Sequence, residues 1–302
     1  MKISAVVNTL NEEKNIAACL DTLGWVDEII VVDMESDDKT KELAYRYTKQ
    51  IFNHSRVGFV EPARNFAIGK ATGEWIIIVD ADERIPQSLA AQLIEIAKED
   101  KYSFVRIPRK NMIFGHFMQH SRWWPDHNIR YFKRGSVEWD DHIHSIPITT
   151  GAGLTLPDDP ALAIEHLHYD SLASYIDKML RYSKVQSDQL IADGYVFSWP
   201  DLILKPAGEF FSRFFAGFGY QDGLHGLALA GLQSFSEFLV FLQVWEKQGF
   251  KRHYGNSFQR QLKTVFTRVA GDFSYWFLTY QLDQTKGKLR RLFIKLRRRL
   301  RI

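Results

Sequence analysis

Apolar and polar residues alternate along the first hundred positions with two different periods. Three short apolar, β-branched runs, each ending at a polar residue, predict buried strands at 3–7, 28–32 and 75–79. The intervening segments carry apolar residues at helical spacing and predict helices at 12–23, 39–47, 64–71 and 86–97. Buried strands that alternate with helices are typical of a parallel sheet covered on both faces. The pattern therefore predicts an α/β protein whose ligands bind at the carboxyl ends of the strands.

The pattern changes twice further along the chain. Residues 103–148 form short strands and loops rich in Trp, His and Arg, and 172–191 is predicted to be helical. Five phenylalanines then recur at helical spacing, either in a core helix or on a membrane-facing one: Phe210, Phe211, Phe214, Phe215 and Phe218. The apolar stretch 224–245 is interrupted by polar residues, so we expect no run of the roughly 18 to 20 uncharged apolar residues of a spanning helix. The predicted division is 1–205 and 206–302.

Composition narrows the class of protein. The chain has 302 residues, of which 45% are hydrophobic and 25% charged, values that exclude a disordered or collagen-like chain. A single cysteine, Cys19, excludes an intramolecular disulfide and is consistent with a reducing compartment. The first residues contain no apolar run of secretory-signal length. We therefore expect an intracellular globular protein.

The net charge of +3 hides an uneven distribution. Nine of the 39 Lys and Arg residues lie in 286–302, which contains no Asp or Glu, so the rest carries 30 basic against 36 acidic residues. Five apolar residues of this tail fall near one helical face: Leu289, Leu292, Phe293, Leu296 and Leu300. Such a helix suits the interface of an anionic membrane. A solvated tail is the alternative, whereas the acidic body and the apolar stripe argue against a nucleic-acid partner.

Polar clusters follow each of the three N-terminal strands, at 8–13, 33–40 and 80–83. A parallel sheet would bring them to one edge. Asp80 and Asp82, two residues apart, can direct oxygens at one divalent cation that also binds phosphates. Asp33 can accept hydrogen bonds from a base or ribose, or else cap a helix. Arg64 can supply positive charge to a diphosphate.

These segments resemble the inverting nucleotide-sugar glycosyltransferases of family 2. The resemblance rests on VVNTLNEEKNI (6–16), IIVVDMESDDKT (29–40), ARNFAIGKATGEWIIIVDADE (63–83) and WWPDHNIRYFKRGSVEW (123–139), and it covers residues 1–245. The most similar subgroup is that of the bacterial lipopolysaccharide core glucosyltransferases. The resemblance implies a GT-A fold, a Rossmann-like nucleotide-sugar-binding domain, followed here by an amphipathic, membrane-associating helical extension.

The resemblance also implies roles for residues. Thr9, Glu12 and Asp33 would contact the nucleoside, and Arg64 would lie near the diphosphate. Asp80 and Asp82 would form the DxD motif that holds Mg²⁺ or Mn²⁺, with Asp82 the more direct ligand. The implied donor is a UDP-sugar, and the implied acceptor is a lipid-linked glycan or lipopolysaccharide. The enzyme would act peripherally on the cytoplasmic face of the membrane.

Two positions depart from the family pattern. Met34 replaces the common second aspartate after the second strand, so that the base site is less polar. Asn8 replaces the usual proline of the first motif.

An inverting transfer needs a general base that takes the proton of the acceptor hydroxyl. Asp141 is the favoured candidate and Asp140 the second, with Glu138 and Asp126 as further possibilities. The subgroup often has a His-Glu pair here, but this chain has His144-Ser145.

Other candidates surround this segment. Two His-x-His pairs, at 142–144 and 166–168, could bind zinc, contact the active-site metal or phosphate, or lie in the core. Trp124 can stack on a sugar, Arg130 can contact acceptor or phosphate or be surface charge, and His144 can contact either. The alternative functions are a polyprenyl-phosphate glycosyltransferase and an inactive nucleotide-binding GT-A module.

Overall fold

The computed structural model of the chain describes residues 1–56, 61–139, 147–252 and 256–300. Contacts between residues divide it into two compact units. The sheet unit comprises Met1–Ile113 and Trp124–His168, and the helical unit comprises Phe114–Trp123 and Tyr169–Ile302. The division does not coincide with the predicted boundary at residue 205, because the residues from Tyr169 onward pack with the C-terminal helices.

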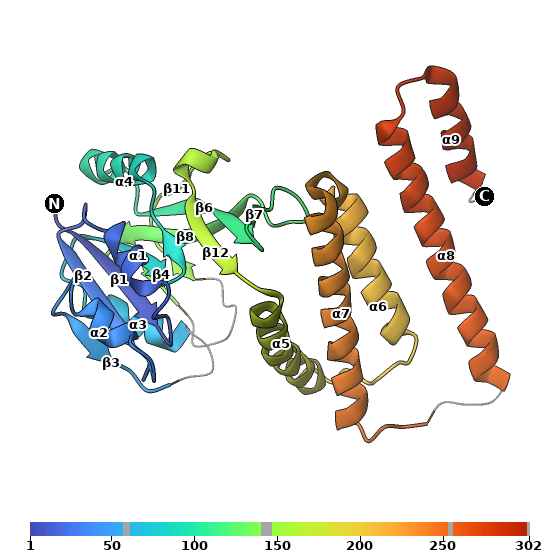
Figure 1. Cartoon of the computed structure of the whole chain (residues 1–302), viewed down its shortest axis with the longest axis horizontal. Coiled ribbons are helices and arrows are strands. Elements are labelled where there is room, and N and C mark those ends of the chain that lie inside the picture. The colour runs from blue at the N-terminus through green and yellow to red at the C-terminus, as the bar shows by residue number, and fades with distance from the viewer. Residues whose placement is uncertain (57–60, 140–146, 253–255, 301–302) are drawn as a thin grey trace. The chain divides into compact units, whose positions relative to one another are not determined.

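A mixed β-sheet forms the centre of the sheet unit, with strand order β3-β2-β1-β4-β8-β6-β12-β5 (Figure 1). The first four strands in this order are parallel, as predicted. Strand β8 runs antiparallel to both β4 and β6. The parallel strands are β1 (Ile3–Thr9), β2 (Glu28–Asp33), β3 (Ile51–Asn53) and β4 (Trp75–Asp80). The others in this order are β5 (Glu83–Arg84), β6 (Phe104–Ile113), β8 (Asp126–Lys133) and β12 (Ile164–Tyr169).

Helices cover both faces of this sheet. One face packs against α1 (Ile16–Asp21), α2 (Thr40–Ala44) and α4 (Gln87–Glu99), and the other against α3 (Glu61–Ile68). Alternate residues of β1 pack into the apolar cores on the two faces of the sheet, because successive side chains of a strand point to opposite sides. The short elements are β9 (Val137–Glu138), β10 (Ile148–Thr149), β11 (Gly153–Thr155) and the 3₁₀ turn η1 (Pro160–Leu162).

Helix α1 begins four residues later than the apolar spacing predicted. Asn11 has a φ of 55°, and the chain then makes a turn in which the amide of Asn15 donates to the carbonyl of Glu12. Residues 11–15 therefore form a polar loop directly after β1, at the edge where the candidate ligands gather.

The helical unit consists of helices joined by short connections. It contains β7 (His116–Phe117), α5 (Leu172–Ala192), α6 (Asp201–Phe211), the π-helical turn η2 (Ser212–Ala216) and the 3₁₀ turn η3 (Gly219–Asp222). It continues with α7 (Gly223–Lys247), α8 (Asn256–Gln284) and α9 (Lys288–Leu300). Helix α7 packs against both α5 and α6, and α8 against α6 and α9.

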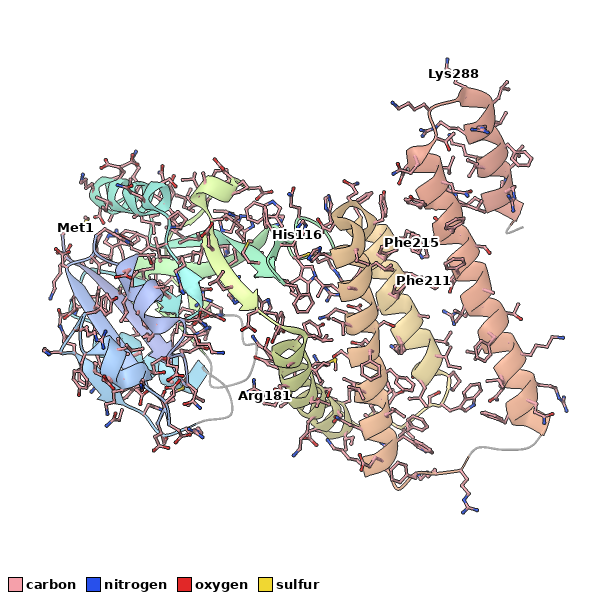
Figure 2. All side chains as sticks on the ribbon, viewed as in Figure 1. Met1, His116, Arg181, Phe211, Phe215 and Lys288 are labelled. Atoms are coloured by element: carbon pink, nitrogen blue, oxygen red, sulfur yellow. The ribbon has the colours of Figure 1, made fainter. Side chains whose placement is uncertain are left out.

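The phenylalanine stripe is largely core. Phe211 and Phe215 (Figure 2) are buried. Both rings lie 6.2–6.3 Å from that of Phe273 on α8. Phe218, at the end of the stripe, is 46% exposed. The core interpretation therefore holds for the central residues of the stripe.

The expectation that no segment is apolar enough to cross a membrane needs correction. Within the described residues, the helix Gly219–Lys247 satisfies the length and composition of a spanning helix. Only 28% of its most apolar window is buried. A core helix of a soluble protein passes the same test, so this composition is weak evidence of insertion.

Two glycines of α7 provide a matched test of packing in the helical unit. A Cβ at Gly226 would lie 1.8 Å from the carbonyl oxygen of Gly219, whereas one at Gly231 would have no neighbour within 4 Å. We expect Gly226→Ala to lower the free energy of unfolding by about 1–3 kcal/mol or more, because backbone must shift. Gly231→Ala should raise it by up to about 1 kcal/mol through helix propensity. Chemical denaturation measures both, and equal effects would contradict the close approach.

Candidate active site

The carboxyl ends of the parallel strands meet at one edge of the sheet. Thr9 is in register with Asp33, and Asn8 with Asp80. The prediction that the three polar clusters share this edge is therefore confirmed. The sheet brings together residues that are more than 70 positions apart in sequence.

The side chains expected to contact the nucleoside lie at the ends of β1 and β2. Thr9 and Asp33 are buried, and neither Thr9 Oγ1 nor Asp33 Oδ1 has a hydrogen-bond partner within the described part of the chain. The other Asp33 oxygen accepts from the amide of Ser36 at 3.2 Å, as a local turn would require. Glu12 accepts from the Asn15 side chain at 2.8 Å. Buried polar atoms without partners are costly, so they mark places where a ligand group would be stabilising.

Asp80 is held by two arginines. Arg130 Nη2 lies 2.6 Å from Asp80 Oδ2, and Arg64 Nη2 lies 3.3 Å from both carboxylate oxygens. Burial alone would raise the pKa of Asp80, but the charges of Arg130 and Arg64 hold that pKa well below its usual range. Asp80 is therefore ionised and paired. Because both of its oxygens face cations, it is the poorer of the two DxD carboxylates for a metal.

Arg130 is a buried ion-pair residue. Its Nη2 also lies 2.9 Å from Glu83 Oε1, and Glu83 Oε2 accepts from the amide of Asp80. Burial alone would lower the pKa of Arg130, but Asp80 and Glu83 raise it instead. The alternative of a surface charge is therefore wrong for Arg130, which is 3% exposed. Its predicted contact with phosphate or acceptor stays a prediction.

Asp82 has a different neighbour from Asp80. Its Oδ2 lies 3.4 Å from Nε2 of His166, whose strand β12 pairs with β5 next to the motif. The ring of His168 stacks on that of His166, with centroids 4.4 Å apart. From the sequence alone, His166 could contact a metal, contact a phosphate or lie in the core. In the structure its ring lies beside the carboxylate of Asp82.

The ion pairs described above for the two aspartates differ in the type of partner. Three arginines, Arg64, Arg109 and Arg130, contact the three carboxylates of Asp80, Glu83 and Asp126. The partner of Asp82 Oδ2 is an imidazole nitrogen of His166. Of the two aspartates, Asp82 therefore has a side chain of a metal-ligating type beside it.

The residues present fit a magnesium or manganese ion that is completed by substrate. No group of three or more His, Cys, Asp or Glu side chains among the described residues is arranged to hold a metal. Mg²⁺ is commonly bound through one or two carboxylates together with substrate phosphates. The Asp82–His166 pair matches such a partial site, and it does not match a closed structural zinc site with four protein ligands.

Several predicted residues lie outside this geometry. Asp140, Asp141 and His144 fall outside the described residues, so the assignment of the base remains a prediction. The chain just before them is fixed, because the Asn65 side chain donates to the carbonyl of Trp139 and accepts from its amide. Trp124 is half-buried two residues before the start of β8, and its sugar-stacking role remains a prediction.

Asp126 is a poor candidate for the base. Arg109 Nη2 lies 2.6 Å from Asp126 Oδ2, and burial, which alone would raise the pKa of Asp126, is outweighed by this arginine. A general base needs a pKa near the working pH, whereas the pKa of Asp126 is lowered. Glu138 lies exposed on β9.

The mixed sheet, with its polar clusters at the carboxyl edge of the parallel strands, has the GT-A-type arrangement that the resemblance implied. The sequence model described as glycosyl transferase family 2 matches residues 4–154. The chain belongs to this family and is a glycosyltransferase, as its resemblance predicted.

Two relatives extend over most of the chain. The lipopolysaccharide core biosynthesis glycosyltransferase LpsC of Rhizobium meliloti is 24% identical, over 83% of this chain and 94% of its own length. The uncharacterized glycosyltransferase RT0209 of Rickettsia typhi is 26% identical, over 81% and 87%. Among solved structures, the mannosyltransferase PcManGT of Pyrobaculum calidifontis, in complex with GDP-Man and Mn²⁺, matches with a TM-score of 0.44 and 16% identity, covering 88% of this chain and 79% of that one.

Two ion pairs of equal length allow a test of how burial changes the contribution of an ion pair to the free energy of unfolding. Arg130 Nη2–Asp80 Oδ2 and Arg56 Nη2–Asp37 Oδ2 both measure 2.6 Å, but the first arginine side chain is 4% exposed and the second 46%. We expect Arg130→Met to lower the free energy of unfolding by about 3–5 kcal/mol, because Glu83 and Asp80 lose a buried cation. Arg56→Met should change stability little, because solvent screens that pair. Urea denaturation measures both, and a small effect of Arg130→Met would contradict the buried network.

Proposed function

We propose that the protein is an inverting, metal-dependent glycosyltransferase that moves a sugar from a nucleoside diphosphate donor, a UDP-sugar, to a lipid-linked or lipopolysaccharide-type acceptor at the cytoplasmic face of the membrane. The observation that carries the proposal is the carboxylate of Asp82 at the ligand-binding edge of the sheet, where its Oδ2 lies 3.4 Å from Nε2 of His166. The relationship to LpsC, which is named for lipopolysaccharide core biosynthesis, supports the choice of acceptor class.

Donor binding would use the ends of β1 and β2. The orphaned oxygens of Thr9 and Asp33 supply hydrogen-bonding capacity for the nucleoside. Arg64 Nε is also buried without a partner among the described residues, which leaves a donor for a phosphate oxygen. Glu12 lies in the adjoining loop and would complete the nucleoside site.

The cation would be held by Asp82 and His166 together with the donor's phosphates. Once bound, Mg²⁺ or Mn²⁺ stabilises the negative charge of a departing diphosphate. Asp80 would contribute less directly, since Arg130 and Arg64 occupy both of its oxygens. Its part is to fix the position of the loop that carries Asp82.

The chain's own residues perform the acid–base step. The carboxylate of Asp141 or Asp140 accepts the proton of the acceptor hydroxyl while the acceptor oxygen forms a bond to the anomeric carbon. The bond from that carbon to the diphosphate oxygen breaks on the opposite face, and the nucleoside diphosphate leaves with the electron pair. Asn65 would help to place this segment, because it binds the backbone of Trp139 directly before it.

Replacement of Asp82 tests the enzyme proposal. We expect Asp82→Ala to reduce metal-dependent sugar transfer and donor hydrolysis by more than about 100-fold, since stabilisation of the leaving group by a metal contributes several kcal/mol. Glu95→Ala, which removes an exposed carboxylate on α4, should leave both rates unchanged.

The assay is release of the nucleoside diphosphate with Mn²⁺ and a panel of nucleotide sugars. Unchanged turnover of Asp82→Ala would refute the metal-dependent mechanism. Binding of a nucleotide sugar without turnover by the wild-type protein would favour the inactive GT-A module. Transfer to polyprenyl phosphate, in place of a glycan, would favour the alternative acceptor.

Membrane attachment would use α9. An amphipathic helix of a soluble domain usually packs its apolar side inward, whereas α9 packs with arginines and leaves its apolar side exposed. Arg298 contacts α8, donating to Thr279 Oγ1 at 3.3 Å and lying over the ring of Tyr275, and Arg291 donates to the Thr285 carbonyl. The apolar stripe lies on the other side of the helix, given 100° per residue. Its members are 51–85% exposed: Leu289, Leu292, Phe293 and Leu296. An apolar stripe flanked by basic residues fits an anionic bilayer surface.

Removal of the tail tests this attachment. We expect deletion of 286–302 to release the protein from anionic liposomes, because each basic residue near the surface contributes about 1 kcal/mol. The triple variant Leu292→Ser, Phe293→Ser, Leu296→Ser keeps every charge and should also bind more weakly. Co-sedimentation with anionic and zwitterionic vesicles measures binding. Full binding of the truncated chain to anionic liposomes would refute the role of the tail. If the deletion abolished binding to a nucleic-acid duplex and left liposome binding unchanged, the partner of the tail would be a nucleic acid.

A further inference from the structure

A chain of polar contacts within the sheet unit links the two aspartates of the DxD motif, and the backbone from Asp80 to Asp82 closes it into a ring. One side of the ring consists of the ion pairs from Asp80 through Arg130 and Glu83 to Arg109. The other side returns through four further residues: Asp126, Asn111, His166 and Asp82. The ring joins strands β4, β8, β5, β6 and β12. It includes four residues to which the proposed reaction assigns nothing: Glu83, Arg109, Asp126 and Asn111.

The direction of hydrogen bonding is set at Asp126. Arg109 donates to its Oδ2 through Nε at 2.9 Å and through Nη2 at 2.6 Å. Although burial alone would raise the pKa of Asp126, the arginine and the amides of Asn111 and Asn128 lower it. Asp126 is therefore an ionised carboxylate, which can only accept hydrogen bonds.

An acceptor at that point fixes the orientation of Asn111. Asn111 Nδ2 must face Asp126 Oδ2, which lies 3.3 Å away, so its carbonyl oxygen faces the other way. That oxygen lies 2.6 Å from Nδ1 of His166. An amide oxygen can only accept, so the proton of this hydrogen bond belongs to His166 Nδ1. Asn111 is 1% exposed, and solvent does not compete for the contact.

The consequence appears on the other nitrogen of His166. With a proton held on Nδ1, Nε2 is the ring nitrogen that can offer a lone pair to a cation, and this atom lies 3.4 Å from Asp82 Oδ2. A divalent cation beside both atoms would have an imidazole nitrogen and a carboxylate oxygen as ligands. The arrangement is that of a metal-binding histidine whose second nitrogen is held by a fixed acceptor.

We propose that Asn111 is a positioning residue that fixes the orientation and tautomer of His166, so that His166 Nε2 and Asp82 form the protein half of the cation site. The proposal rests on the proposed function insofar as the site is metal-dependent. Arg109 and Asp126 act one step further out, because they determine which way Asn111 points. Asn128 provides a natural comparison, since it donates to Asp126 Oδ1 at 3.1 Å but stands outside the ring.

Three variants separate positioning from general packing. Asn111→Leu keeps the approximate size of the side chain and removes the acceptor, Asn111→Asp keeps an acceptor, and Asn128→Ala removes a bond to the same Asp126. Mn²⁺ affinity is measured in the presence of UDP by electron paramagnetic resonance of free Mn²⁺. We expect Asn111→Leu to weaken binding 10–100-fold, as the loss of outer-shell partners of metal-binding histidines does. Asn111→Asp and Asn128→Ala should stay within about threefold of wild type.

A second measurement uses the wild-type protein and does not depend on the folding of any variant. Nitrogen-15 NMR at mildly alkaline pH with Mg²⁺ and UDP, assigned with His166→Gln, reports which nitrogen of His166 carries the proton. We expect the proton on Nδ1 and the lone pair on Nε2. A proton on Nε2 would overturn the proposal, as would equal losses of Mn²⁺ affinity in Asn111→Leu and Asn111→Asp.

Failure of the proposed function gives a different result. If wild-type protein bound no Mn²⁺ with UDP while His166 carried its proton on Nδ1, metal dependence would fail and the tautomer assignment would stand. Retention of wild-type Mn²⁺ affinity by Asn111→Leu, with loss in Asp82→Ala, would overturn the role of Asn111 and leave the metal site intact.

Discussion

The buried ion pair between Arg130 and the two carboxylates of Asp80 and Glu83 is the constraint on which the active-site edge depends. Carboxylates brought together by a sheet edge repel one another, and burial strengthens that repulsion because the local dielectric constant is low. One guanidinium that reaches both of them removes much of this cost. The loop of the DxD motif can therefore be rigid, with Asp82 left to face His166.

The topology of the sheet makes this arrangement possible. The parallel strands supply carboxylates at their ends, whereas Arg130 and Arg109 come from the antiparallel strands β8 and β6, and Arg64 comes from α3. Strand β12 then brings His166 beside the motif through its pairing with β5. Apart from His166, the candidate ligand groups thus come from the parallel half of the sheet, and most of their supporting residues come from the antiparallel half. A substitution in the antiparallel half can alter the site without contacting a substrate.

This division also explains how much the sequence could predict. Thr9, Asp33 and Asp80 were predictable, because each follows an apolar run and strand ends of a parallel sheet meet at one edge. Glu83, Arg109 and Asn111 were not, since their roles depend on antiparallel pairing between strands far apart in sequence. For Arg130 the sequence offered contact with phosphate or acceptor, or surface charge, but it gave no sign that the side chain is buried in an ion pair. The charge of a strand residue does not reveal its burial. The phenylalanine stripe could not be assigned until α8 supplied Phe273 as a packing partner.

Helix α9 illustrates a different limit of sequence reasoning. Its amphipathic pattern is plain, and in an ordinary soluble domain that pattern predicts an apolar side packed inward. Here arginines make the contacts with α8, and the leucines lie outward. Arginine can do so because its long apolar stem packs while its guanidinium donates hydrogen bonds. The basic residues therefore serve two surfaces at once, holding α9 to α8 and leaving charge beside an exposed apolar stripe. A lipid-linked acceptor would be most concentrated at the surface such a stripe favours, which links the uneven charge of the chain to the chemistry at its sheet edge.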